Sequence, residues 1–194
     1  PYRDIRYSGE EIPPIKSFDK TGNTVLANSF SKIFSPGSRL GYILADKSII
    51  DKIYDAKSAT NSHTPMLPQI LCAEFFKRGH YKEHHKRLCE IHRERRDAMM
   101  EALKMYFPKE AKWTYPDGGL FTWVELPENI NTTELLKESL SDPDVMVAYV
   151  AGEGFYTDGN GMGSNAMRMS FGAVPPEQIF EGIEKLGKLI KSKL

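Results

Sequence analysis

A polar loop between two apolar segments is the feature that most restricts how this 194-residue chain can fold. Residues 24–28 and 40–45 have the composition of short buried strands, and the two would fit adjacent positions in a sheet. The segment between them, residues 29–39, has neither helical nor strand periodicity and is rich in hydroxyl and charged side chains. Loops of this kind commonly carry the chemistry of a site.

The loop places a primary amine, hydroxyl groups and a guanidinium close together in the sequence. A partly desolvated Lys32 beside another cation would be available as a nucleophilic amine that attacks an aldehyde. Arg39 can bind a phosphate dianion through paired hydrogen bonds, and Ser29 and Ser31 can donate further ones. These residue types therefore suit a ligand that carries both an aldehyde and a phosphate.

The rest of the sequence alternates between helical and strand patterns. Helices are predicted at residues 46–58, 66–77, 80–106 and 132–140, with a last helix that begins at Pro175 and Pro176. Strands are predicted at residues 112–115, 120–126, 145–150 and 166–171. Before Gly79 the pattern resembles the end of a larger α/β sheet, and after it the pattern is that of a self-contained α+β unit. We therefore expect two domains, residues 1–78 and 79–194.

Composition sets broad limits on function. The 26 Lys and Arg residues balance 26 Asp and Glu residues, so no global field favours nucleic acid or an anionic membrane. No apolar stretch approaches the roughly 20 residues that span a bilayer, and the first residues contain no signal-peptide segment. Cys72 and Cys89 are expected to be reduced thiols. We expect a cytoplasmic chain with no nucleic-acid or membrane partner.

The loop closely resembles a known signature. Its pattern, Ser-x-Ser-Lys-x-x-x-Pro-Gly-x-Arg-x-Gly, is similar to that of the lysine that binds pyridoxal phosphate in class I and II aminotransferases of fold type I. Pro1-Tyr2 resembles the family's Pro-Tyr pair, residues 118–127 its Gly-Gly-x-Phe-x-Trp strand, and residues 165–171 its Asn-x-x-Arg-x-Ser-Phe segment. The likeness covers nearly the whole chain and is to the 2-aminoadipate and kynurenine aminotransferase group.

The resemblance implies a role for each matching residue. Lys32 would hold the cofactor as an internal aldimine and then shuttle the proton of the substrate α-carbon. Ser29, Ser31 and Arg39 would hold the cofactor phosphate, and Tyr2 would donate to its phenolic oxygen.

In the second half of the chain, Arg168, with Asn165, would bind the substrate α-carboxylate. The substrates implied are an α-amino acid and a 2-oxo acid, and no metal is expected.

The resemblance also implies an architecture. Residues 1–78 would be the tail of the family's large α/β domain, a remnant of a mixed sheet with helices, and residues 79–194 its small C-terminal α+β domain with the long interdomain helix. The family's aspartate that precedes the Pro-Tyr pair has no counterpart here. We therefore expect a C-terminal portion of an aminotransferase that is inactive alone and belongs to a homodimer when full length.

Other interpretations stay open. An aminotransferase-like ligand-sensing domain of a helix-turn-helix transcription regulator would keep the lysine without turnover, and a catalytically silent fold could serve protein interaction. The run from Gly152 to Gly163 is interpreted as a flexible loop, not a phosphate loop. The arginines near residues 87–96 are interpreted as an ion-paired helix face, and Trp113 and Trp123 as core residues.

Overall fold

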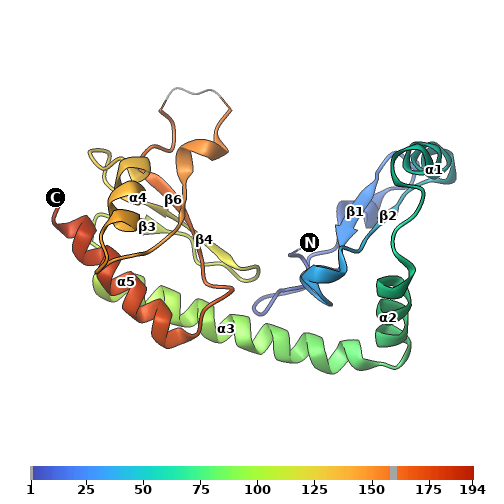
Figure 1. Ribbon diagram of the computed structural model, residues 1–194, viewed down its shortest axis with the longest axis horizontal. Coiled ribbons are helices and arrows are strands. Elements are labelled where there is room, and N and C mark those ends of the chain that lie inside the picture. The colour runs from blue at the N-terminus through green and yellow to red at the C-terminus, as the bar shows by residue number, and fades with distance from the viewer. Residues whose placement is uncertain (1, 158–160) are drawn as a thin grey trace. The chain divides into compact units, whose positions relative to one another are not determined.

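The computed structural model describes residues 2–157 and 161–194, which form two compact units that divide between Cys89 and Glu90 (Figure 1). Pro1, half of the predicted Pro-Tyr pair, lies outside the described residues, as does part of the loop predicted from Gly152 to Gly163. The observed division falls within a long helix, whereas the predicted domain boundary at Gly79 lies in the turn before that helix.

The first unit is built on an antiparallel strand pair. Strand β1 (Leu26–Ser29) pairs with β2 (Gly41–Leu44), with Ser29 opposite Gly41. This confirms that the segments on either side of the polar loop are adjacent strands. The unit also contains η1 (Ile15–Phe18), η2 (Pro36–Ser38), α1 (Lys47–Asn61) and α2 (Met66–Lys77).

Local signals in the sequence account for the helix ends. The Asp46 carboxylate accepts the Ser48 backbone N–H at 3.0 Å and so caps α1. Helix α2 follows Pro65 and ends where Gly79 adopts a φ of 77°, a conformation that costs other residues steric strain. Helix α3 (His80–Tyr106) begins directly after that turn.

The Asp19 carboxylate organises the turn that leads into β1. Its oxygens accept the backbone N–H groups of Thr21, Gly22 and Thr24, each at 2.9 Å, and Lys16 Nζ lies 2.9 Å away. Lys16 first, and then the backbone donors, hold the pKa of Asp19 well below its usual range. The charged form of this side chain therefore stabilises the fold.

The second unit packs helices against one face of an antiparallel sheet. The strand order is β3-β4-β6-β5, with β3 (Lys112–Trp113), β4 (Phe121–Glu125), β5 (Val150–Ala151) and β6 (Ala166–Ser170). The helical elements are the second part of α3, α4 (Thr132–Ser141), η3 (Gly152–Phe155) and α5 (Pro176–Lys191). Among the large side chains fully buried in its core are Leu103, Val124, Met167, Phe171, Leu186 and Ile190.

The strand predicted at residues 145–150 is wrong for most of its length, since only Val150 and Ala151 pair with β6. Met146 adopts a φ of 49°, which breaks an extended strand. The backbone of this segment instead forms hydrogen bonds with Ser139 on α4. The Ser139 Oγ donates to Val147 O at 2.7 Å, and the Ser139 backbone carbonyl accepts the Met146 N–H at 3.0 Å. A buried serine thus replaces the sheet as the partner of this segment.

The interpretation of the α3 arginines as an ion-paired helix face holds for Arg96 in its pairing with Asp97, but this side chain is buried, at 4% exposed. Its Nη1 donates to Pro116 O at 2.6 Å and its Nε to Asp97 at 2.6 Å, while its guanidinium lies 4.4 Å from the Tyr115 ring centre. Arg95 Nη1 donates to Gly172 O at 2.5 Å. These side chains tie loops of the second unit to α3.

Two further sequence predictions concern cysteines and membranes. Cys72 and Cys89 are buried thiols that form no disulfide, as predicted. Burial raises the pKa of the Cys72 thiol.

Within residues 2–157 and 161–194, none of the helices has the length and apolar character that a membrane span requires.

Replacing Gly187 with Ala is expected to destabilise the second unit, although alanine usually favours a helix. A Cβ at Gly187 would lie 2.5 Å from Tyr106 O, whereas one at Gly182 on the same helix would meet only Val147 Cγ2 at 3.6 Å. We expect Gly187→Ala to lower the free energy of unfolding by about 1–3 kcal/mol. Gly182→Ala, the matched control, should raise it by up to about 1 kcal/mol. Urea unfolding measures both, and equal shifts would contradict the packing argument.

Asp19→Asn is expected to change how stability depends on pH. Because the pKa of Asp19 is lowered on folding, its contribution is present above the unfolded value of about 4 and is lost as the pH falls toward the folded value. The variant should be less stable than the parent at pH 7 and should lose less stability on acidification. Asp51→Asn, which removes an exposed partner of Lys47, is the control and should change neither quantity much.

Candidate functional site

The polar loop between β1 and β2 is a closed turn with an apolar underside. The Phe30 N–H donates to Leu40 O at 3.1 Å, so the chain enters and leaves the loop side by side. The Ile33 and Phe34 N–H groups both donate to Phe30 O, which makes one helical turn around Lys32. Ile33 and Leu40 are buried and anchor the loop. Ser31 and Lys32 are left half-buried in the same turn.

The two predicted serines lie together. Ser29 Oγ donates to Ser31 Oγ at 2.9 Å, lies 3.3 Å from Leu40 O, and accepts the Ser31 N–H at 3.1 Å. The Ser31 hydroxyl accepts in this arrangement, so its own proton can be donated to a ligand. The start of the loop is therefore a small, preformed group of hydrogen-bond donors.

Lys32 and Tyr2 also lie close together, although the sequence separates them widely. Lys32 Nζ is 5.7 Å from the centre of the Tyr2 ring, within cation–π range. Both side chains are half-buried. The first unit thus brings together an amine, a phenol and a pair of hydroxyl groups.

Arg39 occupies a strained position at the end of the same loop. It adopts the left-handed conformation, with a φ of 53°, and is exposed. Its Nη1 donates to Pro36 O at 3.2 Å. The side chain thereby stays on the surface of the loop, where the other N–H groups of the guanidinium can meet an anion.

Aromatic rings from α2 support the loop, a feature that the sequence predictions missed. Phe30 lies 5.7 Å from Phe76, and Phe34 lies 5.2 Å from Phe75, between ring centres. Phe30 also lies 5.2 Å from Tyr42 on β2. The adjacent phenylalanines at the end of the predicted helix, facing a Phe pair four residues apart in the loop, are the signal that could have revealed this contact.

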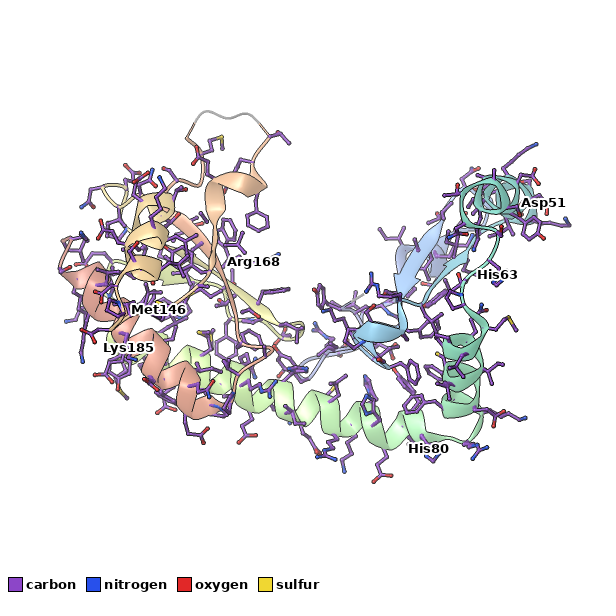
Figure 2. All side chains as sticks on the ribbon, viewed as in Figure 1. Asp51, His63, His80, Met146, Arg168 and Lys185 are labelled. Atoms are coloured by element: carbon purple, nitrogen blue, oxygen red, sulfur yellow. The ribbon has the colours of Figure 1, made fainter. Side chains whose placement is uncertain are left out.

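The predicted residues of the second unit lie at β6. Arg168 is half-buried, with its Cζ 4.2 Å from the Phe121 ring centre and 5.1 Å from that of Phe155 (Figure 2 labels Arg168). Trp123, predicted to be a core residue, is half-buried on the same face, 5.4 Å from Phe155. The core face of β4 holds the buried side chains of Thr122 and Val124 instead.

Asn165 precedes β6 and has a partner within the protein. Its side-chain Nδ2 donates to Leu126 O at 2.5 Å, and its backbone carbonyl accepts the Leu126 N–H at 2.9 Å. The side chain therefore fixes the start of β6. Its predicted contact with a ligand stays a prediction.

The predicted residues thus form two groups, one in each unit. Tyr2, Ser29, Ser31 and Lys32 lie together in the first unit, with Arg39 on the same loop. The second unit carries the Arg168 guanidinium among aromatic rings. The first group has the chemistry to bind an aldehyde and a phosphate, and the second can bind a carboxylate.

Comparison with known proteins identifies relatives. The family model described as "Aminotransferase class I and II" matches residues 2–186. The chain is 38% identical to "Aromatic-amino-acid aminotransferase 1" of Thermococcus litoralis and 34% identical to "2-aminoadipate transaminase" of Thermus thermophilus. Each match covers all of this chain, but only 45% and 48% of those relatives. The chain therefore spans about half the length of the curated relatives it matches.

A solved structure confirms the likeness in fold. The kynurenine aminotransferase of Pyrococcus horikoshii, solved with PMP, KYN and KYA, matches with a TM-score of 0.93 at 37% identity, over all of this chain and 47% of that one. A different kind of relative is the "Uncharacterized HTH-type transcriptional regulator YdfD" of Bacillus subtilis. It is 32% identical, with 94% of this chain and 37% of that protein covered.

Replacing Gly41 with Ala is expected to disturb the loop through its base. A Cβ at Gly41 would lie 2.9 Å from Asn28 O, a backbone atom in the paired strand that cannot move without loosening the pair. We expect lower stability, by about 1–3 kcal/mol, and faster hydrogen exchange of the Phe30 amide. Gly37→Ala is the matched control, because its nearest neighbour would be Ser35 Oγ at 4.0 Å. An unchanged Phe30 exchange rate in Gly41→Ala would contradict the prediction.

Proposed function

This chain belongs to the class I and II aminotransferase family, and from that premise we propose that it serves pyridoxal-phosphate-dependent transamination. The reaction would transfer an amino group from an α-amino acid to a 2-oxo acid acceptor. The observation that carries the proposal is the half-buried Lys32 beside Tyr2, in a turn that begins with the Ser29–Ser31 hydroxyl pair.

The donor set fits pyridoxal phosphate. Lys32 offers the amine that an aldehyde requires, and Tyr2 brings a phenol into the same space. Ser29, Ser31 and Arg39 are the residue types that bind a phosphate dianion, and they lie on one loop. When bound, the cofactor supplies a ring that withdraws electrons from the substrate α-carbon.

Lys32 would act twice. Its Nζ would hold the cofactor covalently, and after the substrate amine has displaced it, the released amine would carry the proton of the substrate α-carbon. Burial against the Tyr2 ring limits the positions that the amine can reach. Tyr2 would donate a hydrogen bond to the cofactor's phenolic oxygen.

Arg168 would bind the substrate α-carboxylate through paired hydrogen bonds. This would hold the α-carbon in a fixed orientation and so favour the loss of its proton. Asn165 would contribute by holding the start of β6 through Leu126.

Several finer assignments belong to the same proposal. Residues 1–78 would be the C-terminal part of the large cofactor-binding domain, and residues 79–194 the small α+β domain with its long helix. The full-length protein would be a homodimer with no nucleic-acid partner. The buried thiols of Cys72 and Cys89, which form no disulfide, support a reducing, cytoplasmic location.

A second candidate function is ligand sensing in a helix-turn-helix transcription regulator. The likeness to the Bacillus subtilis regulator favours it, because that match also covers nearly all of this chain. The cofactor loop would then bind without turnover. The two functions differ in what they require of Arg168: transamination needs it to hold the amino acid while the proton moves to Lys32, whereas cofactor binding requires only the loop with its lysine.

Pyridoxal phosphate is expected to label Lys32 selectively. We would add the cofactor, reduce the mixture with borohydride and map the modified peptide. The parent chain should give one major adduct on Lys32, and Lys32→Ala should lose it because no other amine lies in the turn. Lys20→Ala removes an exposed lysine outside the loop and should keep the adduct. Equal labelling of many surface lysines, unchanged in Lys32→Ala, would contradict the proposal.

A further inference from the structure

The position of Arg168 on its sheet is fixed by strand register. On β6, Met167 and Met169 are 0% and 3% exposed and point to the core, so Arg168 between them points to the opposite face. Its cross-strand neighbours are Trp123 on β4 and Val150 on β5. Phe121, two residues before Trp123, shares this face.

Two phenylalanine rings contact the guanidinium on that face. The Arg168 Cζ lies 4.2 Å from the Phe121 ring centre and 5.1 Å from that of Phe155, both within the range of about 6 Å for a cation–π interaction. Phe155, on η3, is itself held: its ring meets Trp123 edge to face, at 87° and 5.4 Å. The rings hold the charge in place without using its N–H groups.

Other arginines of the same unit show the contrast. Arg95 donates a hydrogen bond to the Gly172 carbonyl, and Arg96 donates one to the Pro116 carbonyl. For the Arg168 guanidinium, the interactions found within residues 2–157 and 161–194 are those with the two rings. A guanidinium held by rings keeps its N–H donors for a planar anion, and a carboxylate accepts two of them side by side.

We propose that Phe121 and Phe155 are positioning residues that orient Arg168 toward a carboxylate. The inference rests on the proposed function, in which Arg168 binds the substrate carboxylate, and it adds the side chains that hold that arginine. Phe121 acts from a strand, while Phe155 acts from η3 and is 47% exposed. The geometry of η3 therefore affects how strongly the carboxylate binds.

The test follows the Arg168 Nε–H group by nuclear magnetic resonance, with Arg168→Lys to assign its signal. The probe is 3-phenylpropionate, an unreactive carboxylate without an amine. We expect saturable binding in the parent chain. Phe155→Ala should weaken it by about threefold to tenfold and shift the Arg168 signal before any probe is added, because a ring is lost. Phe155→Tyr should restore both quantities, and Phe121→Leu, which keeps apolar bulk, should weaken binding.

The control is Phe18→Ala, which removes an exposed ring from η1 and should leave the signal and the affinity unchanged. Parent-like signal and affinity in both Phe155→Ala and Phe121→Leu would overturn the proposal, as would the absence of saturable binding in the parent. Lys32 labelling is measured on the same samples. If labelling persists while the two phenylalanine variants behave like the parent, the positioning role fails and the proposed function stands. If labelling fails while the phenylalanine effects appear, the proposed function fails and the positioning role stands.

Discussion

The pairing of Ser29 with Gly41 is the contact on which the geometry of the polar loop depends. At this point the strands come so close that a Cβ on Gly41 would press on Asn28 O. The bond from the Phe30 N–H to Leu40 O extends the pair one step into the loop and closes its base. Because both ends are fixed there, a single helical turn suffices to place Lys32 beside the serines. The donors of this group therefore owe their arrangement to local structure, which is a reason why a short sequence signature can encode it.

The hydrogen bond that closes the loop does not by itself fix how deeply Lys32 is buried. Ile33 and Leu40 are buried beneath the loop, and Phe75 and Phe76 of α2 pack against Phe34 and Phe30. Full burial of an aliphatic side chain such as Ile33 or Leu40 contributes on the order of 1.5–3 kcal/mol, which offsets part of the entropy lost by ordering the loop.

Most elements could be predicted because their signals are local. The helices at Met66–Lys77 and His80–Tyr106 begin and end as the sequence indicates, since Pro65 and Gly79 mark their boundaries. The prediction of a strand at residues 145–150 was wrong because the backbone of this segment forms a hydrogen bond with Ser139, a residue on another element. The residues of the loop could be predicted from their chemistry and from the family signature. The aromatic contacts of Arg168 could not, because they need the register of β4 on β6 and the position of η3, which are properties of the folded sheet.

The two units differ in what they can reveal about function. Holding a cofactor through Lys32 is common to an enzyme and to a sensor, so the first unit alone does not distinguish the two. Transamination additionally requires that the substrate be held while the proton of its α-carbon moves, and this demand falls on a carboxylate-binding group. A guanidinium tied to backbone carbonyls, as in Arg96, has fewer donors left for that task. Arg168 is held by rings instead, so its position is maintained while its hydrogen-bonding capacity is kept for a ligand. This way of holding a charge would suit the carboxylate-binding role in the proposed function, and it makes the second unit the part of the chain in which the two candidate functions would differ.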